Sequence, residues 1–244
     1  MKKLAVLVFV LASLGMSSQK MNGLLNKESI AKKTSAIKSG GVPKLSNEEV
    51  VKGLKEALTV GTNNSSGMAG KLDGFYKNPR IYIPWPAEAA AMKDKLMKLG
   101  FAKQIEDFEM SLNRAGEEAA LKAAPVFVGA ITNMSVQDGF AILKGTDTAA
   151  TNYLRKTTYA PLKENFMPVV KAAIEKVNVT KYWEPLVTAY NKIPLVKKQN
   201  PDLNEYVTNK AINGLMVLIA DEEIKIRKDP AARVTDLLKK VFGS

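Results

Sequence analysis

The sequence feature that most constrains the fold is the segment from Ala211 to Ala220, which reads AINGLMVLIA. At 100° per residue, apolar side chains lie on every face of a helix formed by this segment, and such a helix is stable only where other elements surround it. We therefore expect a central helix, within Leu203 to Arg227, in a domain of many helices. Asn213 carries the one hydrogen-bonding side chain of the segment and needs a partner if it is buried.

The pattern after Lys44 is helical almost throughout. Ser46 and Glu49 have the spacing of a capping box at the start of an amphipathic helix. The one strand-like stretch, Asn78 to Pro86, is a short extended connector between prolines that cannot build a sheet. Further helices are predicted over residues 87–99, 102–123, 125–134, 136–143, 147–158, 162–177 and 180–191. The predicted fold class is all-α, with one multi-helix globular domain around a buried central helix.

Three local expectations accompany these helices. Residues 61–70 (GTNNSSGMAG) are expected to form a loop, because glycine, asparagine and serine are frequent in turns. Pro168 is expected to kink or restart the helix that contains it. The closing helix is expected to bury one face that includes Val234, Leu238 and Val241.

The N-terminus has the layout of a secretory signal peptide. Lys2 and Lys3 give a basic start, residues 4–14 form an eleven-residue apolar run, and small residues follow up to Ser18. The run is shorter than the roughly 20 residues that cross a membrane. We predict a signal peptide at residues 1–18, a polar tether at 19–43 and one helical domain at 44–244, with no transmembrane segment after signal cleavage. The protein is expected to be exported, and periplasmic if the source is a Gram-negative bacterium.

The chain contains no cysteine and no histidine. Disulfides and a lipid-carrying thiol are therefore excluded, as are Ser-His-Asp and Cys-His catalysis. The commonest zinc ligand and the commonest general base near neutral pH are missing as well. We predict no cofactor and no metal site, and we assign no catalytic residue. A carboxylate-only metal site or a pair of catalytic carboxylates stays possible.

The charge balance indicates which partners to expect. The net charge is +12, and removal of Lys2 and Lys3 with the signal peptide lowers it to +10. Such a charge favours contact with anionic surfaces, although diffuse lysines usually indicate only a solvated surface. Export argues against nucleic acid, and Trp85, Trp183 and the tyrosines are not interleaved with basic residues as in a nucleic-acid platform. We expect no nucleic-acid partner.

The candidate ligand-binding residues form a polar set. Asp221, Glu222 and Glu223 directly follow the apolar segment, so at least one carboxylate is expected at the rim of the core. The acids are either solvated, or paired locally through Glu223 and Arg227, or paired with arginines of other helices in an interior network or polar pocket. The candidate set is Arg114, Asp147, Arg155, Asp221, Glu222, Arg227 and Arg233.

Two members of this set have more local expectations. Arg114 lies opposite the apolar face of its helix and can pair with Glu118 one turn on. Asp147 is a natural N-cap for the helix that follows it, and that helix start could also bind an anion.

Several segments resemble one family. They are residues 45–47, 53–58, 78–79, 83–84, 110–117 (MSLNRAGE), 145–157 (GTDTAATNYLRKT), 190–191 and 229–243 (DPAARVTDLLKKVFG). Together they resemble the bacterial domain-of-unknown-function family 4197, over essentially all of residues 44–243. The resemblance implies an exported, all-helical domain, and it implies no reaction, ligand or catalytic residue.

The expected function is a non-catalytic binding or envelope-support protein, a monomer that contacts an anionic lipid or glycan surface or another envelope protein. A cleft near Arg155 and Asp221 would provide specificity. One alternative is an enzyme that uses carboxylates and arginines, with Asp221, Glu222 and Asp147 as the acids. Another is a helical carrier of a small apolar ligand.

Overall fold

The computed structural model describes residues 45–199 and 202–243. The predicted signal peptide and tether lie outside these residues. The described part consists of helices joined by turns, without a strand, which confirms the all-α prediction. The helices are α2 (Asn47–Ala69), η1 (Ala87–Ala89), α3 (Ala90–Lys98), α4 (Ala102–Ala120), α5 (Ala123–Asn133), α6 (Gly139–Leu143), α7 (Ala149–Lys176), α8 (Val179–Asn191), α9 (Asn204–Lys228), η2 (Pro230–Ala232) and α10 (Asp236–Phe242).

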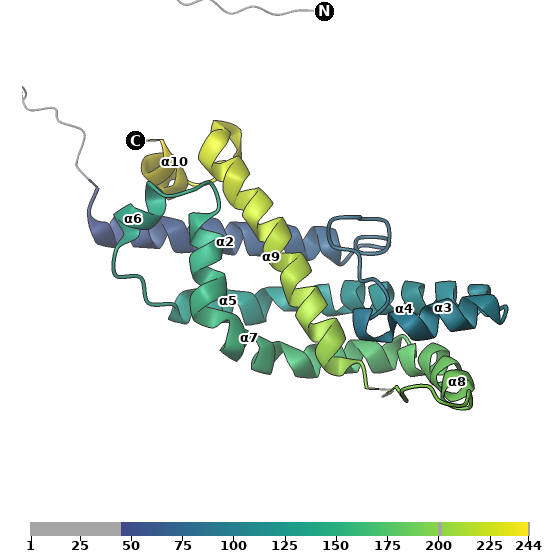
Figure 1. Cartoon of the computed structure of the whole chain (residues 1–244). Coiled ribbons are helices and arrows are strands. Elements are labelled where there is room, and N and C mark those ends of the chain that lie inside the picture. Colours follow the sequence, from purple (N-terminus) through teal and green to yellow (C-terminus); the bar gives the residue numbers. More distant parts are fainter. Residues whose placement is uncertain (1–44, 200–201, 244) are drawn as a thin grey trace, which may run out of the picture. The chain divides into compact units, whose positions relative to one another are not determined.

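Helix α9 lies at the centre, as its apolar sequence predicts. It packs against α2, α4 and α7, and its ribbon crosses those of the other long helices in Figure 1. Gly214 allows the loop after α2 to approach closely, because a Cβ there would lie 3.0 Å from Phe75 Cε1. Ile212, Leu215, Met216 and Ile219 are buried, so the helix contributes side chains to the core in several directions.

The predicted loop at residues 61–70 is wrong, because α2 continues through it to Ala69. Gly61, Thr62, Ser65 and Ser66 are buried within the helix. A Cβ at Gly61 would lie 3.2 Å from Glu222 Cβ, so the small residue permits close contact with α9. Packing along this face outweighs the low helix propensity of the segment, since tertiary contacts provide most helical stability in proteins.

The boundaries of the middle helices also differ from the prediction. The helix expected over 102–123 ends at Ala120, and α5 starts at Ala123 after a two-residue turn. The two helices expected over 147–158 and 162–177 are one, since α7 runs continuously through Pro161 and Pro168. No restart occurs at Pro168.

An aromatic cluster fixes the end of the domain that contains α3 and α8. Trp183 of α8 stacks on Phe108 of α4 with ring centroids 4.5 Å apart, and Trp85 meets both rings edge-on. Trp85 also donates from Nε1 to the carbonyl of Ala89 at 2.8 Å. Both tryptophans are therefore core residues, with Trp85 6% and Trp183 1% exposed.

The C-terminal helix is shorter than predicted. Thr235 caps α10 by accepting from the backbone N–H of Leu238, and Leu238 and Val241 are buried. Val234 is 65% exposed, which contradicts its predicted place on the buried face. It lies in the non-helical segment between η2 and the cap of α10, so the helical periodicity that predicted its burial does not apply there.

Candidate functional site

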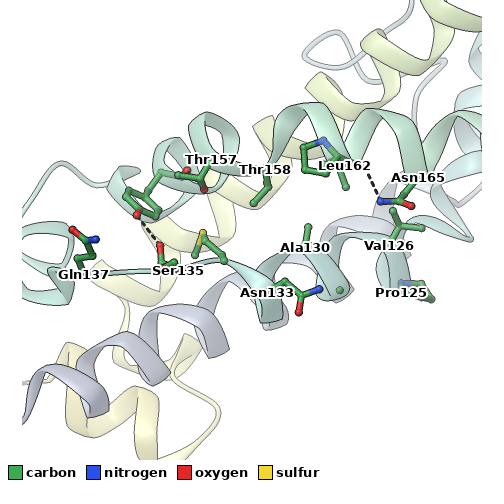
Figure 2. A pocket seen from close by; sticks show the side chains of 14 residues that line it. Pro125, Val126, Ala130, Asn133, Ser135, Gln137, Thr157, Thr158, Leu162 and Asn165 are labelled. Atoms are coloured by element: carbon green, nitrogen blue, oxygen red, sulfur yellow. Dashed lines mark hydrogen bonds between the residues drawn. The ribbon is translucent and has the colours of Figure 1, made fainter.

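A groove of about 870 Å³ runs between α5 and α7 (Figure 2). Its floor includes Met134 and Leu162, which are nearly buried although they line the groove. Phe127 of α5 and Phe166 of α7 also meet edge-on, with centroids 6.0 Å apart. This aromatic contact holds the two helices side by side, so the groove is part of the packed fold.

The rim of the groove is polar but uncharged. Asn133, Gln137 and Asn165 bring carboxamides to it, and Thr157 and Tyr153 bring hydroxyls. Tyr153 Oη donates to the carbonyl of Ser135 at 2.7 Å and so ties α7 to the segment after α5. None of the 14 lining residues carries a charge, although Asp, Glu, Lys and Arg make up 25% of the chain.

Gly129 keeps the groove open on the α5 side. No heavy atom lies within 4 Å of the position a Cβ would take there. Glycine inside a helix is less stable than alanine by about 0.5–1 kcal/mol. The space above Gly129 is therefore maintained at some cost in helix stability.

The sequence interpretation missed this groove, although one signal was available. Residues 123–137 form an uncharged run between Lys122 and Asp138, in a chain where such runs are rare after the signal peptide. Periodicity predicts a helix over residues 125–134, but it does not reveal which neighbouring helix leaves a gap beside it.

Glu223 is the most buried of the predicted acids and accepts hydrogen bonds from the start of α7. Its carboxylate accepts from the backbone N–H of Ala150 at 3.0 Å and from the N–H and hydroxyl of Thr151, both at 2.7 Å. Arg227 donates to it from Nε at 2.9 Å. The carboxylate thus caps α7 from another helix, where the positive end of the helix dipole favours a negative charge.

The predicted capping role of Asp147 is wrong. Thr148 is the N-cap residue of α7 and makes no side-chain cap, while Asp147 pairs with Lys228 at 2.5 Å. Glu223 already supplies the anion at this helix start. The expectation of an external anion there therefore loses its support.

Asp221 and Glu222 also have partners. Arg80 forms a two-pronged ion pair with Asp221, with Nη2 at 2.9 Å from Oδ1, across 141 residues of sequence. Glu222 accepts from Asn64 of α2 at 2.6 Å and from Lys225. Asp221 does not form the predicted interior network, because its partner Arg80 lies in a turn and its side chain is 58% exposed, while Glu223 pairs with Arg227 of its own helix, as the local alternative states.

Arg227 and Arg233 stabilise the C-terminal ends of two helices, Arg227 that of α6 and Arg233 that of α9. Arg227 donates to the carbonyl of Leu143 at 2.7 Å, and Arg233 donates to those of Ile226 and Arg227 at 2.9 and 2.8 Å. Basic groups suit these positions, because the last carbonyls of a helix lack partners and carry partial negative charge.

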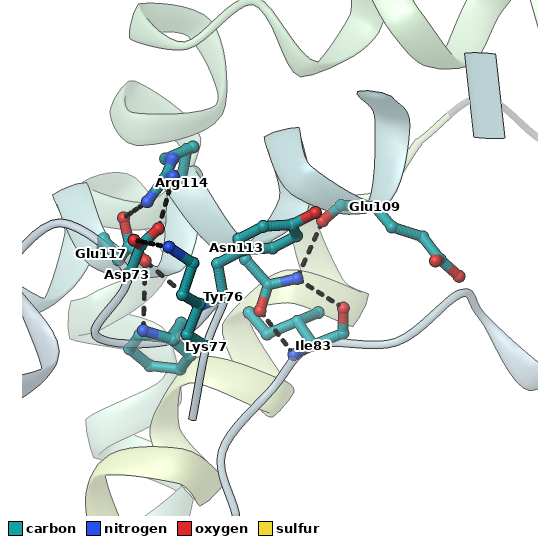
Figure 3. Close-up of polar contacts among 9 residues, drawn as sticks. Asp73, Tyr76, Lys77, Ile83, Glu109, Asn113, Arg114 and Glu117 are labelled. Atoms are coloured by element: carbon teal, nitrogen blue, oxygen red, sulfur yellow. Dashed lines mark hydrogen bonds and ion pairs between the residues drawn. The ribbon is translucent and has the colours of Figure 1, made fainter. Parts of the chain in front are cut away.

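Arg114 fixes the loop after α2 onto α4 (Figure 3). It contacts Glu117, and its Nη2 lies 2.7 Å from Asp73 Oδ1. Glu117 Oε1 in turn accepts from the backbone N–H groups of Phe75 and Tyr76. The predicted partner of Arg114, Glu118, instead pairs with Lys176 at 2.8 Å.

The charges of this loop cluster perturb the pKa of Asp73. Hydrogen bonds from Lys77, first, and from Arg114 hold the pKa of its carboxyl below the ordinary aspartate value. Nearby, Asn113 is fully buried and bonds both the N–H and the carbonyl of Ile83, at 2.8 and 2.9 Å. These contacts anchor the connector that precedes α3.

The predicted polar set therefore does not converge on one site. Arg155 donates to Asn213, which supplies the partner that Asn213 required. Arg114 pairs with Asp73 of the loop after α2, whereas Asp147, Arg227 and Arg233 lie around the end of α9. Glu222 lines a shallow depression of about 500 Å³ with Lys71 and Lys225, where it is the one acidic side chain.

Two further features concern metals and membranes. Within residues 45–199 and 202–243, no three acidic side chains come together as a metal site would require. None of the helices in these ranges combines the length and the apolar character needed to cross a bilayer.

The fold is thus an all-helical domain with an internal polar network and an uncharged groove. The family model described as "Protein of unknown function (DUF4197)" matches residues 44–243, so the chain belongs to this family. This confirms the resemblance seen in the sequence. No curated protein and no solved structure gave a match.

Proposed function

We propose that this domain is a non-catalytic binding protein of the cell envelope, and that the groove between α5 and α7 is its ligand site. The observation that carries the proposal is the uncharged lining of a groove of about 870 Å³ in a strongly basic protein. Ligand sites typically occupy about 300–1,000 Å³ and combine apolar walls with a few polar groups. This groove has both properties.

The lining chemistry favours a neutral ligand with apolar groups. A charged ligand would have to give up water without gaining an opposite charge, which costs free energy. The carboxamides of Asn133, Gln137 and Asn165 each offer a donor and an acceptor, which matches a peptide unit. An uncharged, extended segment of another envelope protein fits this combination, with its apolar side chains toward Met134 and Leu162.

A small apolar ligand is the second candidate, favoured by the volume of the groove. The two candidate ligands would contact different parts of the groove. An apolar molecule packs on the floor and makes no hydrogen bonds with the carboxamides, whereas a peptide does both. Replacing Asn133 and Asn165 by alanine therefore distinguishes them.

The enzyme alternative has lost the residues on which it depended. Asp221 and Asp147 each carry a cationic partner, and Glu222 bonds Asn64 and Lys225. No two of them line the groove. Export, a monomeric state and contact with an anionic envelope surface remain parts of the proposal, supported by residues 1–18 and by the net charge.

The test uses the neutral fluorophore N-phenyl-1-naphthylamine, whose emission rises in apolar surroundings. The wild-type protein should bind it saturably, and Gly129→Leu should abolish that binding by filling the groove. Gly67→Leu is the matched control, because Gly67 is also a helical glycine with open space above it. Equal binding by wild type and Gly129→Leu, or equal loss in Gly67→Leu, contradicts the proposal.

A competition experiment then identifies the class of ligand. Uncharged extended peptides should displace the fluorophore from the wild type, and the Asn133→Ala/Asn165→Ala variant should bind such peptides more weakly while it still binds the fluorophore. Displacement by apolar compounds alone, with no effect of the double substitution, supports the small-ligand candidate instead.

A further inference from the structure

The loop between α8 and α9 presents a fully exposed leucine. Leu195 is 107% exposed, the highest value among the exposed large hydrophobic residues of the described chain. Its φ of 64° lies in the left-handed region, which costs a residue other than glycine or asparagine on the order of 1 kcal/mol. The side chain of Leu195 is not buried, so packing within the domain does not explain why a leucine stands at this strained position.

The loop is held closed at its base. Asn191, the last residue of α8, accepts from the backbone N–H of Gln199 at 3.0 Å and donates to the carbonyl of Gln199 at 3.3 Å. The chain from 192 to 198 therefore projects as one defined turn with Leu195 near its tip. A defined turn presents the leucine with little loss of further conformational freedom on binding.

Lysines flank the leucine on both sides. Lys192, Lys197 and Lys198 are exposed and form no ion pair with a described residue, in contrast to Lys239 and Lys240, which pair with Asp236 and Glu49. The loop from 192 to 198 contains no acidic residue. It combines an apolar tip with uncompensated positive charge.

The turn between α3 and α4 also combines exposed apolar side chains with exposed lysines. Met97 and Leu99 are 48% and 59% exposed, and Lys95 and Lys98 are exposed beside them. Helix α8 packs against both α3 and α4, and Figure 1 shows α3 and α8 at the end of the domain away from α6 and α10. The exposed acids near these two turns and on α8, which are Asp94, Glu106, Glu184 and Asp202, are fewer than the exposed lysines there, which are Lys95, Lys98, Lys103, Lys181, Lys192, Lys197 and Lys198.

We propose that this end of the domain docks on an anionic phospholipid surface, with Leu195 entering the interface and Lys192, Lys197 and Lys198 contacting the headgroups. Each lysine near an anionic membrane contributes attraction that salt screens, and an apolar side chain adds affinity by leaving water. The inference rests on the proposed function, which includes contact with an anionic envelope surface. It specifies that surface as phospholipid and names the residues that contact it.

The test is co-flotation of the chain from Gln19 onward with vesicles of phosphatidylcholine, with and without phosphatidylglycerol. Wild type should bind vesicles that contain phosphatidylglycerol, and added salt should weaken that binding. Leu195→Asn keeps the left-handed backbone accessible and should weaken binding on the order of tenfold. Lys197→Ala/Lys198→Ala should weaken it by a similar factor.

The controls are Leu72→Ser, which removes a leucine that is 77% exposed elsewhere, and Lys239→Ala/Lys240→Ala at α10. Both should bind like wild type. Equal losses in the controls, or no loss in the loop variants, overturn the proposal. A loss with the lysine variant but none with Leu195→Asn means that charge alone attracts the protein to the vesicles, without entry of the leucine, and this also overturns the proposal. Fluorophore binding in the groove is scored separately on the same variants, so failure of this inference is distinct from failure of the proposed function.

Discussion

Replacing Glu223 should destabilise the domain more than replacing any exposed acid. Its carboxylate is 1% exposed and accepts from two backbone N–H groups, one hydroxyl and Arg227. Glu223→Ala leaves these donors unpaired at the start of α7 and leaves Arg227, whose side chain is 10% exposed, without its counter-charge. Breaking a buried pair in this way costs about 3–5 kcal/mol. Domains are stable by only about 5–15 kcal/mol, so this loss is a large part of the stability of a typical domain.

Urea unfolding provides the measurement. Trp183 and Trp85 are buried and report the aromatic cluster, while circular dichroism reports the helices, and coincident transitions establish two-state behaviour. Glu223→Gln keeps the shape and one acceptor oxygen, so it should lose less than Glu223→Ala and stay folded if the alanine variant does not. Glu205→Gln removes an exposed partner of Lys163 and should leave the midpoint nearly unchanged.

A double-mutant cycle separates the ion pair from the helix cap. Arg227→Met should cost less than Glu223→Ala, because the carboxylate keeps its three contacts with α7. The two changes together should cost less than their sum by at least about 1 kcal/mol, since both remove the same pair. A Glu223→Ala variant as stable as wild type would refute the view that this carboxylate joins α7 to α9.

Two further predictions concern packing and pH. Gly116→Ala should destabilise the domain by about 1–3 kcal/mol, because its Cβ would lie 2.9 Å from Ile83 Cδ1. Gly67→Ala should stabilise the domain by about 0.5–1 kcal/mol, because the space around its Cβ is open. Thermal unfolding should show a lower midpoint for the first variant and a higher one for the second. The lowered pKa of Asp73 stabilises the fold above the ordinary aspartate pKa of about 3.9, and this stabilisation is lost as the pH falls through the folded-state value. Asp73→Asn should therefore make the urea midpoint fall less steeply below about pH 4, and an unchanged slope would contradict the assignment.

The sequence predicted a helix correctly where the signal lies within the helix itself, as a cap or as the pattern of its apolar residues. The capping box of Ser46 and Glu49 is present as predicted, and the apolar segment from 211 to 220 identified α9 as the central helix. Residues 61–70 failed because their helical state depends on α9, which lies about 150 residues further along the chain. Composition alone cannot show that a glycine faces another helix rather than solvent.

The polar contacts depended even more on distant partners. Asp147 has every local property of a cap, but Glu223 occupies the helix start from 72 residues away, and Arg80 reaches Asp221 across 141. The groove needs both the uncharged run of α5 and its placement beside α7. The uncharged run can be seen in the sequence. The placement of α5 beside α7 is a result of packing, to which the aromatic pair Phe127 and Phe166 contributes.

The most direct test of the central claim locates the neutral fluorophore by amide chemical-shift changes. On titration of the wild-type protein with N-phenyl-1-naphthylamine, the shifts should change along the groove, at residues such as Gly129, Ala130, Asn133, Thr157 and Asn165. Gly129→Leu should show no such changes. Shifts confined to other surfaces, or a pattern that Gly129→Leu leaves intact, would contradict the assignment of the α5–α7 groove as the ligand site.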